Sequence, residues 1–162
     1  MKYKYILFDL DGTITESGPG IMNSVEYALN KMNREVGERD TLKKFIGPPL
    51  TESMEKYYGM SEEEALLGVK YYREYYAVKG IFENSVYEGL AETLEFLKNE
   101  GYILAVATSK PEEYAKRIAD KFDFAKYFAG IYGATMDGSL IRKADVIRYA
   151  LDNLGVEREN YD

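Results

Sequence analysis

The sequence predicts an α/β fold, in which a parallel sheet is flanked by helices and a helical block is inserted after the first strand. Apolar runs at residues 4–8 and 102–107 have the composition of buried strands, and the second run is apolar on both faces. Strand and helix patterns alternate in the second half, as parallel sheets require. Residues 17–80 show helical patterns only, so the predicted domains are a core of residues 1–16 and 81–162 and an inserted block of residues 17–80.

The first half of the chain begins with the strand at residues 4–8 and continues with helices. Pro19 near the start and Gly37 beyond the end bound the first helix. Ser61 and Glu64 have the spacing of a capping box, which predicts the start of a long helix. The helices expected in this half cover residues 19–32, 41–45, 50–58 and 61–79.

The second half alternates between strands and helices. Ser109 and Glu112 again fit a capping box, so a helix is expected to begin there, directly after the strand at residues 102–107. A short strand is expected at residues 130–132. The helices expected in this half cover residues 90–100, 109–122 and 145–154.

The charge and the missing residue types limit the possible chemistry. The chain has 21 Lys and Arg against 28 Asp and Glu, a net charge of −7, and it has no Cys or His. Nucleic acid polymers and anionic membranes are bound through clustered Lys and Arg, so neither is an expected partner. Without Cys and His, thiolate and imidazole catalysis and the usual zinc sites are excluded. Catalysis must use carboxylates, Lys, Tyr, Ser or Thr, with an oxygen-binding cation such as Mg²⁺.

The N-terminal residues lack the apolar stretch and cleavage site of a signal peptide, and no run is long enough to span a bilayer. A cytoplasmic location is therefore expected. The expected assembly is a monomer or a weak homodimer.

Two carboxylates follow the first strand directly. Asp9 ends the strand and Asp11 comes two residues later, where the carboxyl ends of parallel strands form sites. Asp9 is suited to attack phosphorus, and Asp11 to protonate the leaving group and later deprotonate water. Two like charges ~4 Å apart repel by roughly 4 kcal/mol at an effective dielectric near 20, so a phosphate dianion at this pair requires added positive charge. Mg²⁺ and a lysine would supply it.

These residues resemble motifs of the haloacid dehalogenase-like (HAD) hydrolase superfamily, phosphatase branch. Residues 9–13, Asp-Leu-Asp-Gly-Thr, resemble the first motif, and the strand that ends in Thr108-Ser109-Lys110 resembles the second. Lys143 falls where the third-motif lysine is expected. Residues 45–50 and 108–111 resemble the phosphoglycolate phosphatase-like and nucleotidase-like group. The resemblance implies a Rossmann-like three-layer core with an inserted α-helical cap.

The resemblance also implies a role for each residue. Asp9 is the implied nucleophile and Mg²⁺ ligand, and Asp11 is the implied acid/base, with its backbone carbonyl on Mg²⁺. Lys143 would neutralise the phosphate and Asp9 together. The implied phosphate-binding residues are Gly12, Thr13, Thr108, Ser109 and Lys143. In the cap, Lys44 and the loop at Gly47 and Pro48 would contact the leaving group, with Lys43 an equal candidate to Lys44.

The implied activity is a Mg²⁺-dependent phosphatase that hydrolyses a small phosphomonoester, of the phosphoglycolate or nucleoside monophosphate type, through an aspartyl-phosphate. The expected partner is therefore a small phosphorylated metabolite. The acidic residue at position 11 argues for phosphate chemistry, because the dehalogenase branch lacks an acid there. A phosphomutase uses the same pair and stays a rival interpretation. A phosphoacceptor binding domain and a catalytically impaired fragment also stay open.

The fourth motif of the family, an apolar strand ending in Gly-Asp with another Asp close by, is not found before Asp162. The C-terminal part of the core is therefore expected to be absent, and the chain to represent part of a phosphatase of about 200–230 residues. Mg²⁺ would then have a single protein carboxylate and water, and the first strand would lack a neighbour.

Overall fold

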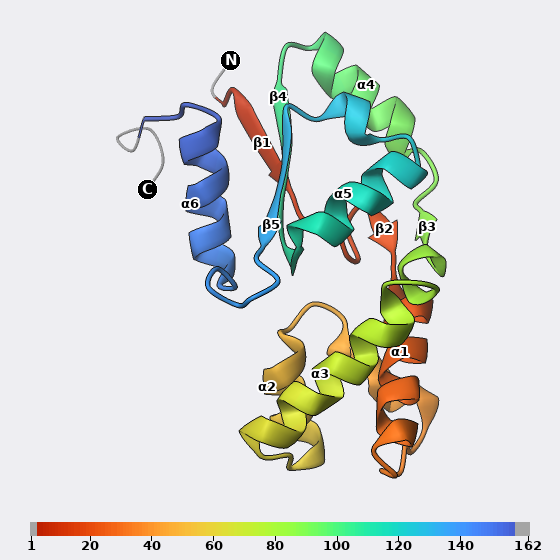
Figure 1. The fold of residues 1–162 in the computed structure, drawn as a ribbon. Helices are drawn as coiled ribbons and strands as arrows, with labels where there is room; N and C mark the ends of the chain where they lie inside the picture. Colours follow the sequence, from red (N-terminus) through yellow and green to blue (C-terminus); the bar gives the residue numbers. More distant parts are fainter. Residues whose placement is uncertain (1–2, 158–162) are drawn as a thin grey trace. The chain divides into compact units, whose positions relative to one another are not determined.

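A computed structural model describes residues 3–157. The chain forms two compact units, Met1–Ile14 with Val86–Asp162 and Thr15–Ser85 (Figure 1). The sequence pattern placed the changes of unit after residues 16 and 80, whereas the packing places them after Ile14 and Ser85. The second unit thus includes the short strand β2 (Thr15–Glu16) and the first of the two residues of β3 (Ser85–Val86).

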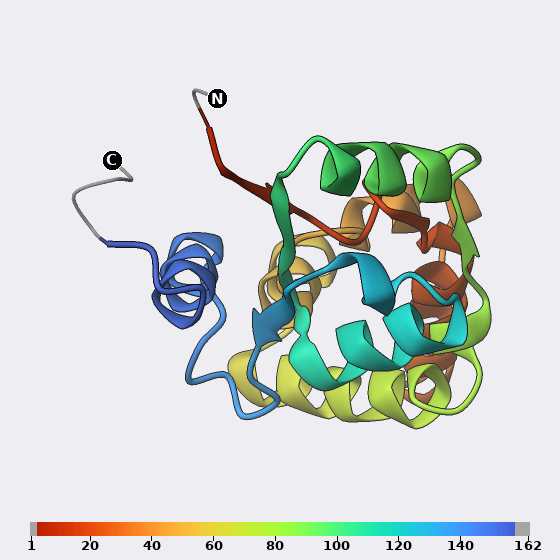
Figure 2. The same ribbon diagram turned by 90° about the horizontal axis from the view of Figure 1, so that it is seen from above.

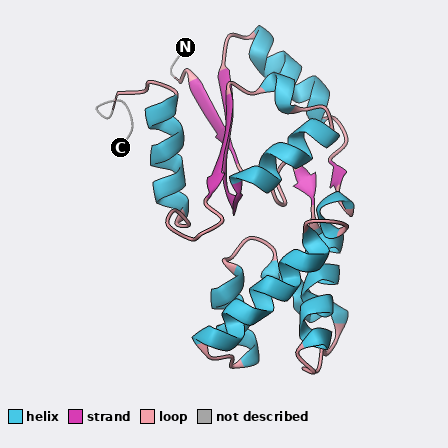
Figure 3. Cartoon of the chain, in the orientation of Figure 1, coloured by secondary structure: helices cyan, strands magenta, loops and turns pink. Residues whose placement is uncertain are grey.

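The first unit is built on a parallel sheet. Its strands are β1 (Tyr5–Phe8), β4 (Ile103–Pro111) and β5 (Gly130–Ala134), in the order β1-β4-β5. The register places Phe8 beside Val106 and Thr108 beside Gly133. The central strand is buried from Leu104 to Thr108, as expected of a strand with a neighbour on each side. Figure 3 shows the three arrows pointing the same way, so their carboxyl ends share one edge of the sheet.

Helices cover both faces of this sheet. Figures 1 and 2 show α6 (Lys143–Asn153) on one face and α4 (Leu90–Asn99) and α5 (Glu112–Lys121) on the other. On the α6 face, Val146 and Ala150 pack against Ala107 of β4. On the other face, side chains such as Leu94 of α4 are fully buried, which contributes about 1.5–3 kcal/mol for each large apolar group. The Rossmann-like three-layer core predicted from the sequence is confirmed.

The predicted capping box at Ser109 and Glu112 is wrong. β4 continues to Pro111, and α5 begins at Glu112 without a side-chain cap. The reason is a tertiary contact, because the pairing of β4 with β5 is irregular between Thr108 and Pro111 and the backbone of Gly133 lies against this segment. The Glu112 carboxylate instead accepts a hydrogen bond from the Gly133 amide at 3.2 Å.

The second unit consists mainly of helices. Its longest helix, α3 (Glu62–Tyr76), packs against both α1 (Gly18–Lys31) and α2 (Leu50–Tyr58). The capping box at its start is confirmed, because the Glu64 amide donates to Ser61 Oγ and the Ser61 amide donates to Glu64 Oε2, at 3.3 and 3.0 Å. The remaining elements of the chain are β2 (Thr15–Glu16), η1 (Arg39–Phe45), η2 (Gly80–Phe82), β3 (Ser85–Val86) and η3 (Ala125–Tyr127). β2 and β3 pair with each other in a separate two-stranded sheet.

A close backbone crossing joins α1 to η2 inside the second unit. A Cβ atom at Gly20 would lie 1.9 Å from the Gly80 carbonyl oxygen, so only glycine fits at Gly20. The Gly20 amide donates to the Glu83 carbonyl at 3.0 Å, and Ser24 Oγ donates to the Gly20 carbonyl at 2.6 Å.

Across residues 3–157, no helix combines the length and the hydrophobicity that crossing a membrane requires.

Candidate active site

Asp9 and Asp11 lie at the carboxyl end of β1, on either side of a buried anchor. Leu10 between them is fully buried, and the amides of Thr13 and Ile14 donate to its carbonyl at 3.2 and 2.9 Å. This tight turn requires a positive φ at Gly12, +77°, which glycine adopts without strain. The turn directs the two carboxylates into different surroundings, because the Asp9 side chain is 44% exposed and that of Asp11 only 12%.

Each of the two acids forms an ion pair with its own lysine. Lys143 Nζ, on the first residue of α6, lies 2.7 Å from Asp9 Oδ2. Lys110 Nζ, near the end of β4, lies 3.0 Å from Asp11 Oδ2. The first contact is an ion pair by distance, without the alignment of a hydrogen bond. The arrangement places two cations against two anions, so the repulsion expected between the carboxylates is compensated.

The second oxygen of each carboxylate, Oδ1, also has different surroundings in Asp9 and in Asp11. Asp9 Oδ1 accepts a hydrogen bond from the Leu10 amide at 2.8 Å, which fixes the orientation of this carboxylate. Asp11 Oδ1 is buried and has no hydrogen-bond partner among the described residues. A buried carboxylate oxygen of this kind is satisfied by a proton, a water molecule or a cation. The two acids thus suit different tasks: Asp9 is accessible, and Asp11 is enclosed with one oxygen free.

The predicted phosphate-binding residues lie at the same edge of the sheet. Thr108 is 1% exposed, and its Oγ1 accepts a hydrogen bond from the Lys110 amide at 3.2 Å, which leaves the hydroxyl hydrogen available to a ligand. Ser109 is half-buried in the same irregular segment of β4. Gly12 and Thr13 are exposed in the turn after β1. Their contact with phosphate stays a prediction.

Sequence reasoning did not single out Lys110 as a site residue. The signal was present, because Lys110 is the third residue of the Thr-Ser-Lys segment that resembles the second motif. The local pattern hides it, because that pattern ends the strand at residue 107 and begins a helix at Ser109. Only the pairing of β4 with β5 reveals that Lys110 belongs to the strand and is buried, with a relative exposure of 8%.

The predicted cap residues lie in the second unit. Lys44 Nζ lies 4.3 Å from the centre of the Tyr57 ring, a cation–π contact. Lys43, the equal candidate, forms an ion pair with Asp40 at 3.0 Å. Gly47 has a positive φ of +104°, and Pro48 follows it in the loop before α2. Their contact with a substrate, like that of the lysines, stays a prediction.

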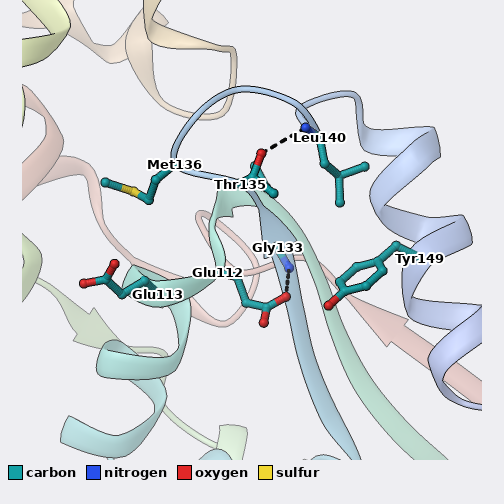
Figure 4. Close-up of a pocket in the computed structure, with 8 residues that line it drawn as sticks. Glu112, Glu113, Gly133, Thr135, Met136, Leu140 and Tyr149 are labelled. Carbon is teal, nitrogen blue, oxygen red and sulfur yellow. Dashed lines mark hydrogen bonds between the residues drawn. The ribbon is translucent and has the colours of Figure 1, made fainter.

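A separate pocket of about 370 Å³ lies beside β5 (Figure 4). It is lined by Glu112, Glu113, Gly133, Ala134, Thr135, Met136, Leu140 and Tyr149. None of the predicted site residues is in this set. Its Glu112 carboxylate already accepts a hydrogen bond from the Gly133 amide and forms an ion pair with Lys116. The hydrogen bond between Lys116 and Glu112 raises the pKa of Lys116. We therefore assign the chemistry to the acid pair rather than to this pocket.

The acid pair can contribute to a Mg²⁺ site. Residues 3–157 contain no cluster of three or more His, Cys, Asp or Glu side chains that could enclose a metal. In phosphate-handling enzymes, however, Mg²⁺ is commonly held by one or two carboxylates, substrate phosphate and water. Asp9, whose carboxylate is accessible, fits that kind of open site as the carboxylate ligand, and the expected contact of the Asp11 backbone carbonyl with Mg²⁺ stays a prediction.

Comparison with known proteins agrees with these features. The sequence model of the family described as "Haloacid dehalogenase-like hydrolase" matches residues 6–161. A 5'-nucleotidase from Pseudomonas aeruginosa is 42% identical over 160 residues, which are 99% of this chain and 72% of the relative. The tyrosine-protein kinase PtkA of Mycobacterium tuberculosis is 41% identical over 150 residues, 92% of this chain and 50% of the relative.

A solved structure has the same fold. The crystal structure of a predicted phosphatase from Clostridium acetobutylicum superposes with a TM-score of 0.93 at 47% identity, over 98% of this chain and 73% of that one. The family match spans nearly the whole chain and includes the acid pair, the Thr-Ser-Lys segment and Lys143. The chain therefore belongs to the haloacid dehalogenase-like hydrolases.

Proposed function

We propose that this chain carries a Mg²⁺-dependent phosphatase that hydrolyses a small phosphomonoester through an aspartyl-phosphate. The observation that carries the proposal is the pair of carboxylates after β1, one accessible and one enclosed, each paired with a lysine. Such a pair separates the nucleophile from the acid/base by environment, and phosphoryl transfer relies on positioned charge of this kind.

In the first step, an Asp9 carboxylate oxygen attacks phosphorus and the bond from phosphorus to the leaving oxygen breaks. Asp11 donates its proton to that oxygen, so the alcohol leaves neutral and Asp9 carries the phosphoryl group. Lys143, at 2.7 Å from Asp9, is placed to compensate charge on the incoming phosphate. The Thr108 hydroxyl is proposed to donate to a phosphoryl oxygen. When bound, Mg²⁺ supplies further positive charge to the phosphate and to Asp9.

In the second step, Asp11 is a carboxylate and takes a proton from water. The resulting hydroxide attacks the phosphorus of the aspartyl-phosphate, and the bond between phosphorus and the Asp9 oxygen breaks. Inorganic phosphate leaves, the Asp9 carboxylate is restored and Asp11 is again protonated. Both half-reactions use the same two residues, which matches the presence of a single enclosed acid beside a single accessible one.

We propose a nucleoside monophosphate or a phosphoglycolate-type compound as the substrate. The 42% identity to a 5'-nucleotidase supports the first, the 31% identity to a phosphoglycolate phosphatase supports the second, and the segments at residues 45–50 and 108–111 resemble both kinds of enzyme. The similarity to the tyrosine-protein kinase PtkA offers an alternative, in which the phosphoryl group passes to a tyrosine rather than to water. A phosphomutase would instead return the phosphoryl group to its substrate. Release of free phosphate distinguishes hydrolysis from both.

The test is phosphate release from p-nitrophenyl phosphate, nucleoside monophosphates and phosphoglycolate, with and without Mg²⁺. We expect Mg²⁺-dependent release that Asp9→Asn abolishes and Glu92→Gln, an exposed acid on α4, leaves unchanged. Absence of Mg²⁺-dependent release from every substrate would overturn the proposal. Transfer to a tyrosine peptide without free phosphate would favour a kinase, and transfer between sugar positions would favour a phosphomutase.

A further inference from the structure

We propose that Lys110 is a positioning residue, which holds the Asp11 carboxylate in the orientation needed for proton transfer. The inference rests on the proposed function, because it assigns Lys110 a task in that reaction. Lys110 Nζ lies 3.0 Å from Asp11 Oδ2, and the two side chains are 5% and 12% exposed. An ion pair shielded from water to this degree is held far more firmly than one on the surface.

The backbone of Lys110 is constrained from several sides. Its amide donates to Thr108 Oγ1 at 3.2 Å. A Cβ atom at Gly133 would lie 2.5 Å from the Lys110 carbonyl oxygen, so β5 closely covers this part of β4. Pro111 follows, and a residue before proline is restricted to extended conformations. The lysine stem therefore starts from a fixed position, which limits where its ammonium group can lie.

The pair leaves Asp11 with one oxygen for chemistry. Oδ2 is held by Lys110, and Oδ1 is buried without a hydrogen-bond partner in the part of the chain that is described. A carboxylate free to rotate would exchange its two oxygens, whereas one anchored through Oδ2 keeps Oδ1 in one place. Proton transfer requires the acid oxygen within hydrogen-bond reach of the leaving oxygen, so this anchoring has a direct effect on the reaction.

Lys110 and Lys143 are therefore expected to have different tasks. The side chains of Lys143 and its partner Asp9 are each about two-fifths exposed, although Nζ itself is covered, so this lysine lies beside the carboxylate that an entering phosphate would approach. Lys110 is enclosed together with Asp11. If Lys110 turned to a phosphate instead, the buried Asp11 carboxylate would lose its counter-charge, which is costly. The Thr108 hydroxyl lies on the same constrained segment, so one stretch of β4 sets both a phosphate contact and the orientation of the acid.

The kinetic test compares leaving groups. p-Nitrophenolate leaves without a proton, whereas the alkoxide of phosphoglycolate requires one. We expect Lys110→Met to lower kcat for phosphoglycolate at least about tenfold more than kcat for p-nitrophenyl phosphate, with little change in KM, and Lys110→Arg to restore part of it. Adding Lys110→Met to Asp11→Asn should cause no further loss. Equal losses with both substrates, or additive losses in the double variant, would overturn the inference.

An unfolding cycle separates this inference from the proposed function. Lys110→Met and Asp11→Asn should each lower the urea midpoint, because each leaves a buried group without its partner, and the double variant should fall no further than either. If no protein turns over any substrate, the proposed function fails and the kinetic role of Lys110 fails with it. The cycle then still decides whether the pair holds Asp11, since additive shifts of the midpoint would refute it.

Discussion

Lys143 Nζ lies 2.7 Å from Asp9 Oδ2, and both side chains are partly open to solvent. The contact joins the first residue of α6 to the residue after β1, so it depends on the packing of α6 on the sheet. Although Nζ itself is covered, the side chains are about two-fifths exposed, and an ion pair screened by solvent in this way contributes only about 0–1 kcal/mol to stability. Its main effect is therefore expected in charge compensation at the nucleophile rather than in stability.

Lys143→Met should lower kcat/KM about 100-fold or more while hardly changing the urea midpoint, because positive charge beside Asp9 is lost and little packing is. Steady-state kinetics and urea unfolding measure the two effects. Lys126→Met is the matched control, since Lys126 pairs with Asp123 on the surface away from the acid pair. A large loss of stability together with a small loss of activity would contradict the prediction.

Beryllofluoride, which mimics a phosphoryl group on a carboxylate, should raise the Tm of the protein in the presence of Mg²⁺. A ligand that binds only the folded state stabilises it by mass action. Asp9→Asn should abolish the shift, because it removes the attacking oxygen, whereas Asp152→Asn on α6 should retain it. Differential scanning fluorimetry gives the readout, and an undiminished shift in Asp9→Asn would argue against Asp9 as the nucleophile.

Phosphate release should require Mg²⁺ at millimolar concentration and stop when a chelator is added. The described residues offer one accessible carboxylate for the metal rather than a cluster of three acids, so affinity depends on substrate phosphate and water as further ligands. A Mg²⁺ titration of the initial rate at several substrate concentrations measures this. Saturation at micromolar Mg²⁺, independent of substrate, would contradict it.

Gly20→Ala should destabilise the second unit by about 3 kcal/mol. A Cβ there would lie 1.9 Å from the Gly80 carbonyl oxygen, and relieving that clash requires a shift of the closely packed backbone. Urea unfolding followed by circular dichroism of the helices measures the loss. Gly59→Asn is the control, because Gly59 has φ +62° with open space around it and Asn tolerates that conformation. Equal stability of the two variants would contradict the packing.

Hydrogen bonds from Thr135 and Ser139 lower the pKa of Asp137, in the loop after β5, from 3.8 to about 2. Because the folded pKa is lowered, the stabilisation is present above pH 3.8 and is lost as the pH falls toward 2. Thr135→Val should move the titration midpoint of this carboxyl back toward 3.8, as NMR of the carboxyl carbon would record. An unchanged midpoint would show that the Thr135 hydrogen bond is not the main cause of the lowered Asp137 pKa.

Much of the fold could be predicted from local sequence patterns. The periodicity of α1, the capping box of α3 and the apolar runs of β1 and β4 each follow from residues close together in the chain. The start of α5 could not, because Ser109 satisfies a local capping pattern but the pairing of β4 with β5 draws it into the strand. A local rule fails here because a tertiary contact stabilises a different conformation.

By itself, the sequence predicted the acid pair from residue types and spacing, and it predicted Thr108 and Lys143 through the resemblance of their segments to motifs of the family. The resemblance already implied Lys143 beside Asp9, but only the tertiary structure decided that Lys110 pairs with Asp11. Lys143 lies on Asp9 and Lys110 on Asp11, although neither lysine is near its partner in the chain. Such pairing depends on where β4 and α6 bring their side chains in space and on how much water is excluded there, and neither quantity is encoded in a local pattern.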